Sequence, residues 1–261
     1  MTTSAPPINQ RTAEEGKMMT IIEHLMELRT RLMIAVLALV AGVAVSIWPL
    51  TGWTIDFLVQ PADHKYPGFT LAQFTLLDYW STYFRVSLLL GLALAMPVIM
   101  YQVLAFIAPG LTPEERRWLF PIVFGCAGMF IGGMAFAYYV TLPPALDFLL
   151  DPASENVEPV IGVQSYIDTV TRLLFLTGLT FQLPFVIMAL AKIGVVTSGK
   201  LIRWWRVSIL LSVVAAAIVT PSIDPVTQAI VAVPIMVLYC LGIVLARLVE
   251  ANSFLASRRN F

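Results

Sequence analysis

Charged side chains are scarce in this sequence. Only 12% of its 261 residues are Asp, Glu, Lys or Arg, whereas a soluble domain carries about 25%. Apolar residues make up 59% of the chain, and the mean hydropathy is +0.84. A water-soluble core of this size cannot use so many apolar side chains. The composition therefore argues against an ordinary globular enzyme and indicates a protein whose solvent is lipid.

Residues that form catalytic or metal centres are also few. Cys126 and Cys240 are the only cysteines, and both lie in apolar runs without a CxxC motif, so we interpret both as buried hydrophobes. We expect the two histidines, His24 and His64, on opposite sides of a membrane, where they cannot share a metal. The sequence contains no GxSxG, HExxH or P-loop motif. A net charge of 0 favours no nucleic-acid partner. We therefore expect no enzyme activity, cofactor or metal.

Six stretches of 17 to 29 residues contain no charged side chain. A membrane-spanning helix needs about 20 apolar residues, so all six are long enough, with the fifth marginal. Period-2 alternation, which marks a membrane β-barrel, is absent. The sequence therefore predicts an all-α polytopic membrane protein with six transmembrane helices. We place them within residues 21–250, between a polar N-terminal tail (1–20) and a C-terminal tail (251–261), at about 32–50, 84–106, 118–142, 166–193, 204–221 and 227–247.

Basic residues predict the orientation of these spans. Thirteen of the 16 Lys and Arg residues fall in the two tails or in the second and fourth connections, which all lie on one side of the predicted topology. The positive-inside rule assigns that side to the cytoplasm, so we expect both termini there. The positions of the tryptophans support these spans, because all of them fall at predicted span ends, where amphipathic rings settle at the headgroup level. They are Trp48, Trp53, Trp80, Trp118, Trp204 and Trp205.

Two acidic segments are predicted on the cytoplasmic side. In the first, Glu23, Glu27 and Arg31 recur every four residues and share one helix face. This face is either solvated, with a local Glu27–Arg31 pair, or presents a carboxylate just below the membrane surface. In the second, AFIAPGLTPEERR, prolines and a glycine break the chain, and Glu114 and Glu115 follow Thr112 as in a capped first helical turn.

The second segment also allows a functional interpretation beside the capping role. It places another carboxylate, and the ring of Phe106, on the same membrane side as Glu27. Paired, partly desolvated carboxylates are suited to binding guanidinium groups, which they hold bidentately.

Polar residues within the spans suggest helix contacts. Gln182 lies in the middle of the fourth span and needs a partner in lipid. That partner is a carbonyl freed by Pro184, a neighbouring helix or another subunit. The i,i+4 spacing of Asp168 and Arg172 predicts a local ion pair.

Glycines and prolines within the spans suggest how the helices pack. The GxxxG motif at Gly128 and Gly132 predicts close helix packing. Pro97, Pro184 and Pro234 recur in spans of one direction, where each is expected to bend its helix.

The ordered set of motifs resembles the TatC family, the multi-span receptor subunit of the twin-arginine protein translocase. The resemblance covers about residues 20–250, through HLMELRTRL, PVIMYQVLAFIAPGLTPEERR, GMAFAYYV, FQLP and TPSIDP. It implies a cupped six-helix bundle in the cell (plasma) membrane with both termini cytoplasmic.

The resemblance also implies roles for individual residues. Glu27 and Glu115 match the acidic positions that receive the arginine pair of a signal peptide, and Arg29 and Phe106 match positions of the same site. Pro61 and Asp224 match outer-loop motif positions. Gln182 matches a polar position associated with single-span partner subunits, where many members have Glu. Gln182 keeps the hydrogen bonding of that position but cannot ionise.

Two functions follow as hypotheses. The resemblance implies a receptor for twin-arginine signal peptides of folded cargo. Such a receptor assembles single-span subunits of the TatA or TatB type, and copies of itself in the bilayer, for export driven by the proton-motive force. The alternative is a secondary transporter of a small solute or ion, since such proteins bind substrate at interrupted helices near the bilayer midplane. Gradient-driven solute uptake by liposomes containing this chain alone would favour the transporter.

Overall fold

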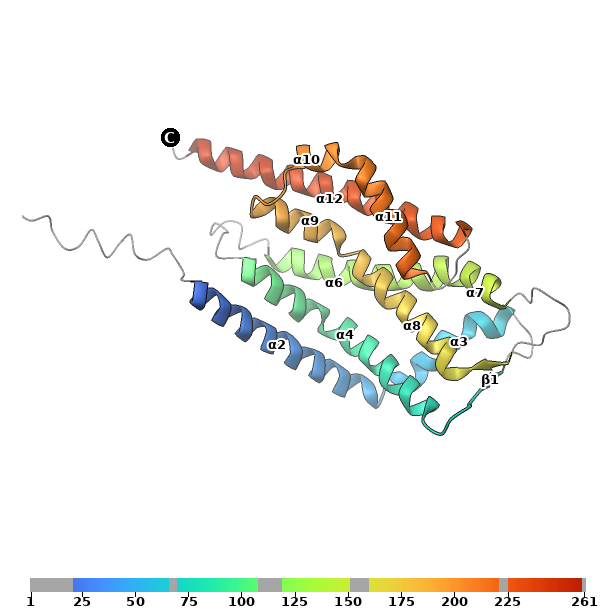
Figure 1. The fold of residues 1–261 in the computed structure, drawn as a ribbon. Coiled ribbons are helices and arrows are strands. Elements are labelled where there is room, and N and C mark those ends of the chain that lie inside the picture. Colours follow the sequence, from blue (N-terminus) through green and yellow to red (C-terminus); the bar gives the residue numbers. More distant parts are fainter. Residues whose placement is uncertain (1–20, 66–69, 108–118, 151–159, 221–224, 260–261) are drawn as a thin grey trace, which may run out of the picture.

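A computed structural model describes residues 21–65, 70–107, 119–150, 160–220 and 225–259 (Figure 1). The regular secondary structure of the described residues is helical except for one short pair of parallel strands, β1 (Leu71–Ala72) and β2 (Ile161–Gly162). The helical elements are α2 (Ile21–Ile47), α3 (Thr51–Lys65), α4 (Asp78–Ile107), α6 (Leu119–Phe136), η4 (Ala137–Thr141), α7 (Leu142–Leu150), α8 (Val163–Thr180), α9 (Leu183–Lys192), α10 (Ser198–Arg203), α11 (Trp205–Val219) and α12 (Pro225–Arg259).

Five helical segments are long and apolar enough to cross a membrane. They are Ile22–Ile47, Asp78–Phe106, Phe120–Leu150, Val163–Lys192 and Pro225–Ala251. Helix α11 is also apolar but has 15 residues, which is about 22 Å of helix against about 30 Å of hydrocarbon. The prediction of a helical membrane protein is thus confirmed for five candidate spans, and a sixth span through α11 stays a prediction.

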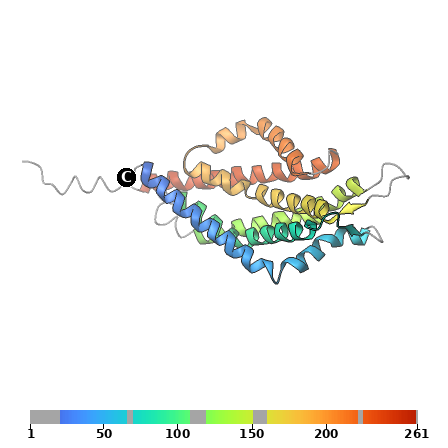
Figure 2. The ribbon, with the colours of Figure 1, turned by 60° about the horizontal axis from the view of Figure 1, so that its bottom comes forward.

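The long helices lie side by side as a bundle (Figures 1 and 2). Helix α4 contacts α2, α6 and α8, while α12 contacts α9 and α11. One end of the bundle, here called the Glu27 end, contains the start of α2, the end of α4, the start of α6 and the end of α12 (Figure 1). The opposite end, here called the α3 end, contains α3, α7 and the two strands. The first and last described helices therefore have their outer termini at the same end.

Helices α2 and α4 pack with their backbones in contact. A Cβ atom built on Gly91 would lie 2.6 Å from the backbone nitrogen of Val43, a separation that side-chain-bearing residues cannot adopt. Closer to the α3 end, the Ser46 hydroxyl donates to the carbonyl of Ser87 over 2.9 Å, and the Thr51 and Ser87 hydroxyls are 2.9 Å apart. Small residues let α2 and α4 approach, and buried hydroxyl groups of α2, α3 and α4 then form hydrogen bonds between the helices.

Two of the three prolines that were expected to bend their spans lie inside continuous helices. Helices α4 and α12 continue through Pro97 and Pro234. The fourth predicted span is broken at Phe181 and Gln182 between α8 and α9, directly before Pro184.

A local widening of the helix accommodates the adjacent prolines Pro143 and Pro144. Neither has an N–H to donate to a carbonyl one turn earlier. In η4 the backbone widens instead, and the N–H of Leu142 donates to the carbonyl of Ala137, five residues back. Helices α6 and α7 therefore form one continuous helical segment.

The close contact between α6 and α8 does not use the GxxxG motif. Cβ atoms built on Gly128 and Gly132 meet nothing within 4 Å. A Cβ built on the next residue, Gly133, would lie 2.9 Å from the Cα of Gly178. The expectation for Gly128 and Gly132 was wrong, because the contacting face of α6 is turned by one residue, about 100° around the helix.

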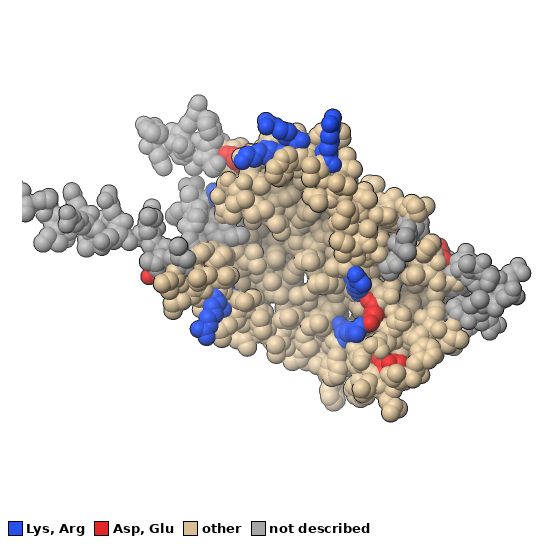
Figure 3. All heavy atoms as spheres, viewed as in Figure 1, with Lys and Arg blue, Asp and Glu red and all other residues tan. Residues whose placement is uncertain are grey.

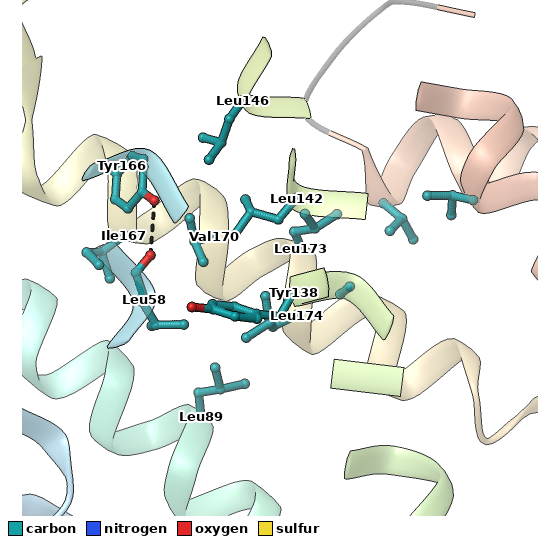
Figure 4. Close-up of a cluster of buried hydrophobic side chains, with 14 of the residues drawn as sticks. Leu58, Leu89, Tyr138, Leu142, Leu146, Tyr166, Ile167, Val170, Leu173 and Leu174 are labelled. Atoms are coloured by element: carbon teal, nitrogen blue, oxygen red, sulfur yellow. Dashed lines mark hydrogen bonds between the residues drawn. The ribbon is translucent and has the colours of Figure 1, made fainter. Parts of the chain in front are cut away.

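Helix α3 is fixed to the bundle by two tyrosines. The Tyr166 hydroxyl donates to the carbonyl of Leu58 over 3.0 Å (Figure 4), and the Tyr138 hydroxyl donates to that of Phe57 over 2.8 Å. Around these bonds lies the main apolar core, where Leu58, Ile167 and Leu173 are almost fully buried. The α3 end is therefore a packed cap on the bundle.

Candidate functional site

Glu27 of α2 is the centre of a small polar cluster at the Glu27 end. Its Oε1 atom accepts a hydrogen bond from Arg31 Nε over 2.9 Å, and Arg31 Nη2 forms an ion pair with the same oxygen. The pair is partly buried, with 19% of the Glu27 side chain and 25% of the Arg31 side chain exposed. The local pairing expected from the i,i+4 spacing is confirmed.

The second carboxylate oxygen of Glu27 is not satisfied in the same way. Oε2 is buried and has no hydrogen-bond partner among the residues that the structure describes. Nδ1 of His24 lies 3.8 Å from this oxygen, which is too far for a hydrogen bond. A buried acceptor without a donor is costly, so this oxygen is available to a donor from outside the described residues.

An aromatic surface lies next to this carboxylate. The His24 ring stacks on Phe106 of α4, with centroids 4.3 Å apart and planes inclined by 18°. Phe106 is thus brought to the same end of the bundle as Glu27, although 79 residues separate them in the chain. A carboxylate with one unused oxygen, beside stacked rings, is an arrangement that can hold a guanidinium, because that group both hydrogen bonds bidentately and stacks on aromatic faces.

The other predicted site residues are distributed differently. Arg29 is exposed and lies two residues from Glu27, about 200° around the helix, so it faces away from the cluster. Pro61 lies within α3, at the opposite end of the bundle. Glu115 and Asp224 fall in segments 108–118 and 221–224, outside the described residues.

Gln182 is buried at the break between α8 and α9. Only 3% of its surface is exposed, and its Nε2 donates to the carbonyl of Cys126 in α6 over 2.8 Å. Of the partners considered from the sequence, the structure selects the neighbouring helix. The Oε1 atom is buried without a partner within the described part of the chain. Cys126 is buried as expected, whereas Cys240 is exposed on α12, contrary to the interpretation of both as buried.

Asp168 forms its ion pair with another helix. Its carboxylate contacts Arg85 of α4, and the local pair with Arg172 expected from spacing is not the contact that forms. All three residues line one hollow, and Figure 3 shows basic side chains on either side of an acidic one on a mostly uncharged face. Sequence spacing could not reveal Arg85, because the α4–α8 register is a tertiary property.

Long apolar helices side by side, with a polar cluster at one end, define a multi-pass helical membrane protein. A family model described as "Sec-independent protein translocase protein (TatC)" matches residues 23–234, which is most of the chain. The chain belongs to the TatC family.

Similar proteins and solved structures agree with this family assignment. A Synechocystis TatC protein is 35% identical in an alignment of 240 residues that covers 88% of this chain and 89% of that protein. The chloroplast TatC protein of Arabidopsis thaliana is 41% identical over 87% of this chain, which spans 66% of that longer protein. A crystal structure of the twin arginine translocase receptor TatC is 33% identical, with a TM-score of 0.74 over 87% of this chain and all of that one.

Proposed function

We propose that this chain is the receptor and core subunit of a twin-arginine translocase, in which Glu27 and Glu115 bind the arginine pair of a signal peptide. The single observation that carries the proposal is the half-used carboxylate of Glu27, whose buried Oε2 lacks a donor among the described residues. Family membership supports this role over solute transport. Glu115 and Arg29 enter the proposal through the family resemblance.

Physical chemistry supports arginine as the ligand. A guanidinium presents several donors in a rigid plane, so it can bond Oε2 while it stacks on the adjacent rings of His24 and Phe106. A lysine ammonium keeps the charge but lacks the planar fork. The apolar part of the signal would then follow the lipid-facing helices into the bilayer.

Gln182 supports a second part of the proposal, the docking of single-span partners beside α8, α9 and α11. Its Nε2 is already bonded to Cys126, so only Oε1 remains to accept a hydrogen bond. A partner helix that docks here would have to supply a donor. A neutral amide at this position restricts the contact to hydrogen bonding, without charge pairing.

The proposal includes the membrane arrangement. We place six spans in a cupped bundle in the cell membrane, with the Glu27 end and both termini in the cytoplasm. The common location of the start of α2 and the end of α12 supports an even number of crossings (Figure 1). The short α11 would span by local thinning of the bilayer or with the help of Trp204 and Trp205 near its start.

Site-specific cross-linking of a labelled signal peptide tests the receptor role. We expect an Arg-Arg signal to cross-link to the membrane-embedded chain, and a Lys-Lys signal to cross-link much less. Glu27→Gln or Glu115→Gln should reduce the Arg-Arg product about tenfold or more, since a hydrogen bond to a charged group contributes about 1.5–3 kcal/mol.

A matched control is available at the other end of the bundle. Asp56→Asn removes an exposed carboxylate from α3 and should leave cross-linking unchanged. Unchanged cross-linking in both glutamate variants, with the protein still folded, would refute the receptor role.

A further inference from the structure

The charged hollow near the α3 end is not explained by the proposed receptor role. It has a volume of about 670 Å³ and is lined by residues of α2, α4 and α8. Leu39, Leu88 and Phe175 form part of its apolar wall, and Arg85, Asp168 and Arg172 supply its charges. An apolar hollow with three ionisable side chains within candidate membrane spans is unusual, because charges in spans are expensive and mark functional sites.

The charges in the hollow do not balance. Asp168 pairs with Arg85, which leaves the formal positive charge of Arg172 unmatched. Arg172 is exposed and has no hydrogen-bond or ion-pair partner among the residues that the structure describes. The three side chains therefore give the hollow a formal charge of +1, which favours an anionic ligand.

The position of the hollow along the helices limits what that anion is. Arg85 lies seven residues from the start of α4, and Arg172 nine residues from the start of α8. These spacings correspond to about 10 and 14 Å of helix. Long basic side chains at such depths extend towards the headgroup layer while their stems stay in apolar surroundings. A ligand that meets both the charges and the apolar wall must be anionic at one end and hydrocarbon at the other.

We propose that the hollow is a binding site for an acidic phospholipid of the leaflet at the α3 end. The Arg172 guanidinium binds the lipid phosphate, and Arg85, which is paired with Asp168, contributes a second positive charge. The acyl chains lie along Leu88, Leu92 and Phe175. The net positive charge favours an anionic headgroup over a zwitterionic one, and it repels the basic region of a signal peptide. Bidentate phosphate binding is the geometry for which arginine is suited.

Native mass spectrometry of the full chain, released from detergent micelles with added phosphatidylglycerol, tests this site. The wild-type protein should retain one tightly bound phosphatidylglycerol and should retain phosphatidylcholine less. Arg172→Gln should weaken the tightest lipid site about tenfold or more, because a charge-assisted bond is lost. Glycerophosphate without acyl chains should not displace the lipid.

Asp168→Asn separates lipid binding from a purely structural ion pair. It frees Arg85 and raises the charge of the hollow to +2, so lipid retention should increase. If the Arg85–Asp168 pair only joins α4 to α8, this variant should lose retention through misfolding. Arg172→Gln removes an exposed side chain without a described partner, so it should stay folded by size-exclusion chromatography.

Arg203→Gln is the control, since it removes an exposed arginine from α10 near the other end of the bundle. It should leave the tightest phosphatidylglycerol site unchanged. Equal retention by wild type and Arg172→Gln would overturn the proposal and favour an acidic protein segment as the occupant. Displacement of the lipid by glycerophosphate, or equal losses in Arg203→Gln and Arg172→Gln, would overturn it as well.

Discussion

Arg31 Nε lies 2.9 Å from Oε1 of Glu27, one helical turn away on α2, while Oε2 of the same carboxylate has no described partner. Arg31 thus occupies half of the acceptor that a signal arginine is proposed to use. The internal pair holds the carboxylate in place and also competes for it. The balance between these two effects can be measured.

Arg31→Gln should strengthen binding of an Arg-Arg signal peptide, because it frees Oε1 of Glu27. Partly exposed ion pairs contribute about 0.2–1 kcal/mol, so the dissociation constant should fall by a factor of about 1.4 to 5. Fluorescence anisotropy of a labelled peptide with the detergent-solubilised chain measures this change. Lys200→Gln, which removes an exposed basic residue from α10, should not strengthen binding. Weaker binding by Arg31→Gln would mean that Arg31 contacts the peptide or positions Glu27, and does not compete.

Gln182→Leu should lower both the stability of the chain and the docking of single-span partners. The substitution removes the bond to Cys126 and the free Oε1 acceptor. Interhelical hydrogen bonds in membranes contribute about 0.6 kcal/mol on average and at most about 1.7 kcal/mol, so the loss of unfolding free energy should be small. Thermal unfolding and co-purification of a tagged partner would report the two effects separately. Gln60→Leu in α3 should change neither, and full partner recovery with Gln182→Leu would contradict the docking role.

Neighbouring glycines of α6 should respond in opposite ways to alanine. The added Cβ of Gly133→Ala would lie 2.8 Å from the Phe181 ring and 2.9 Å from Gly178 Cα. Overpacking of this kind costs about 1–3 kcal/mol. Gly132→Ala meets nothing within 4 Å and should be neutral or slightly stabilising, since alanine favours helix over glycine. Equal melting temperatures for the two variants would contradict the observed α6–α8 contact.

Local features of this chain were accessible from its sequence. The long helices could be predicted because the length of an apolar run and its lack of charge are properties of each segment by itself. The Glu27–Arg31 pair was also predictable, since both residues lie on one helix. Successive spans run in opposite directions, so the sequence also predicted that Phe106 shares an end of the bundle with Glu27.

Features that depend on helix register were not accessible. Asp168 pairs with Arg85 of α4, not with Arg172 one turn away. The close contact of α6 uses Gly133, not the adjacent GxxxG motif. The bond of Gln182 to Cys126 likewise depends on how α6 packs beside the α8–α9 break. Each depends on the rotation of one helix against another, and a single sequence does not contain that information.

A double-mutant cycle between receptor and ligand tests the central claim most directly. Peptide affinity is measured for wild type and Glu27→Gln, each with the Arg-Arg signal and with signals in which one arginine is replaced by glutamine. The account predicts a coupling energy of about 1.5–3 kcal/mol between Glu27 and one of the two arginines. Effects that simply add, with no coupling to either arginine, would contradict it.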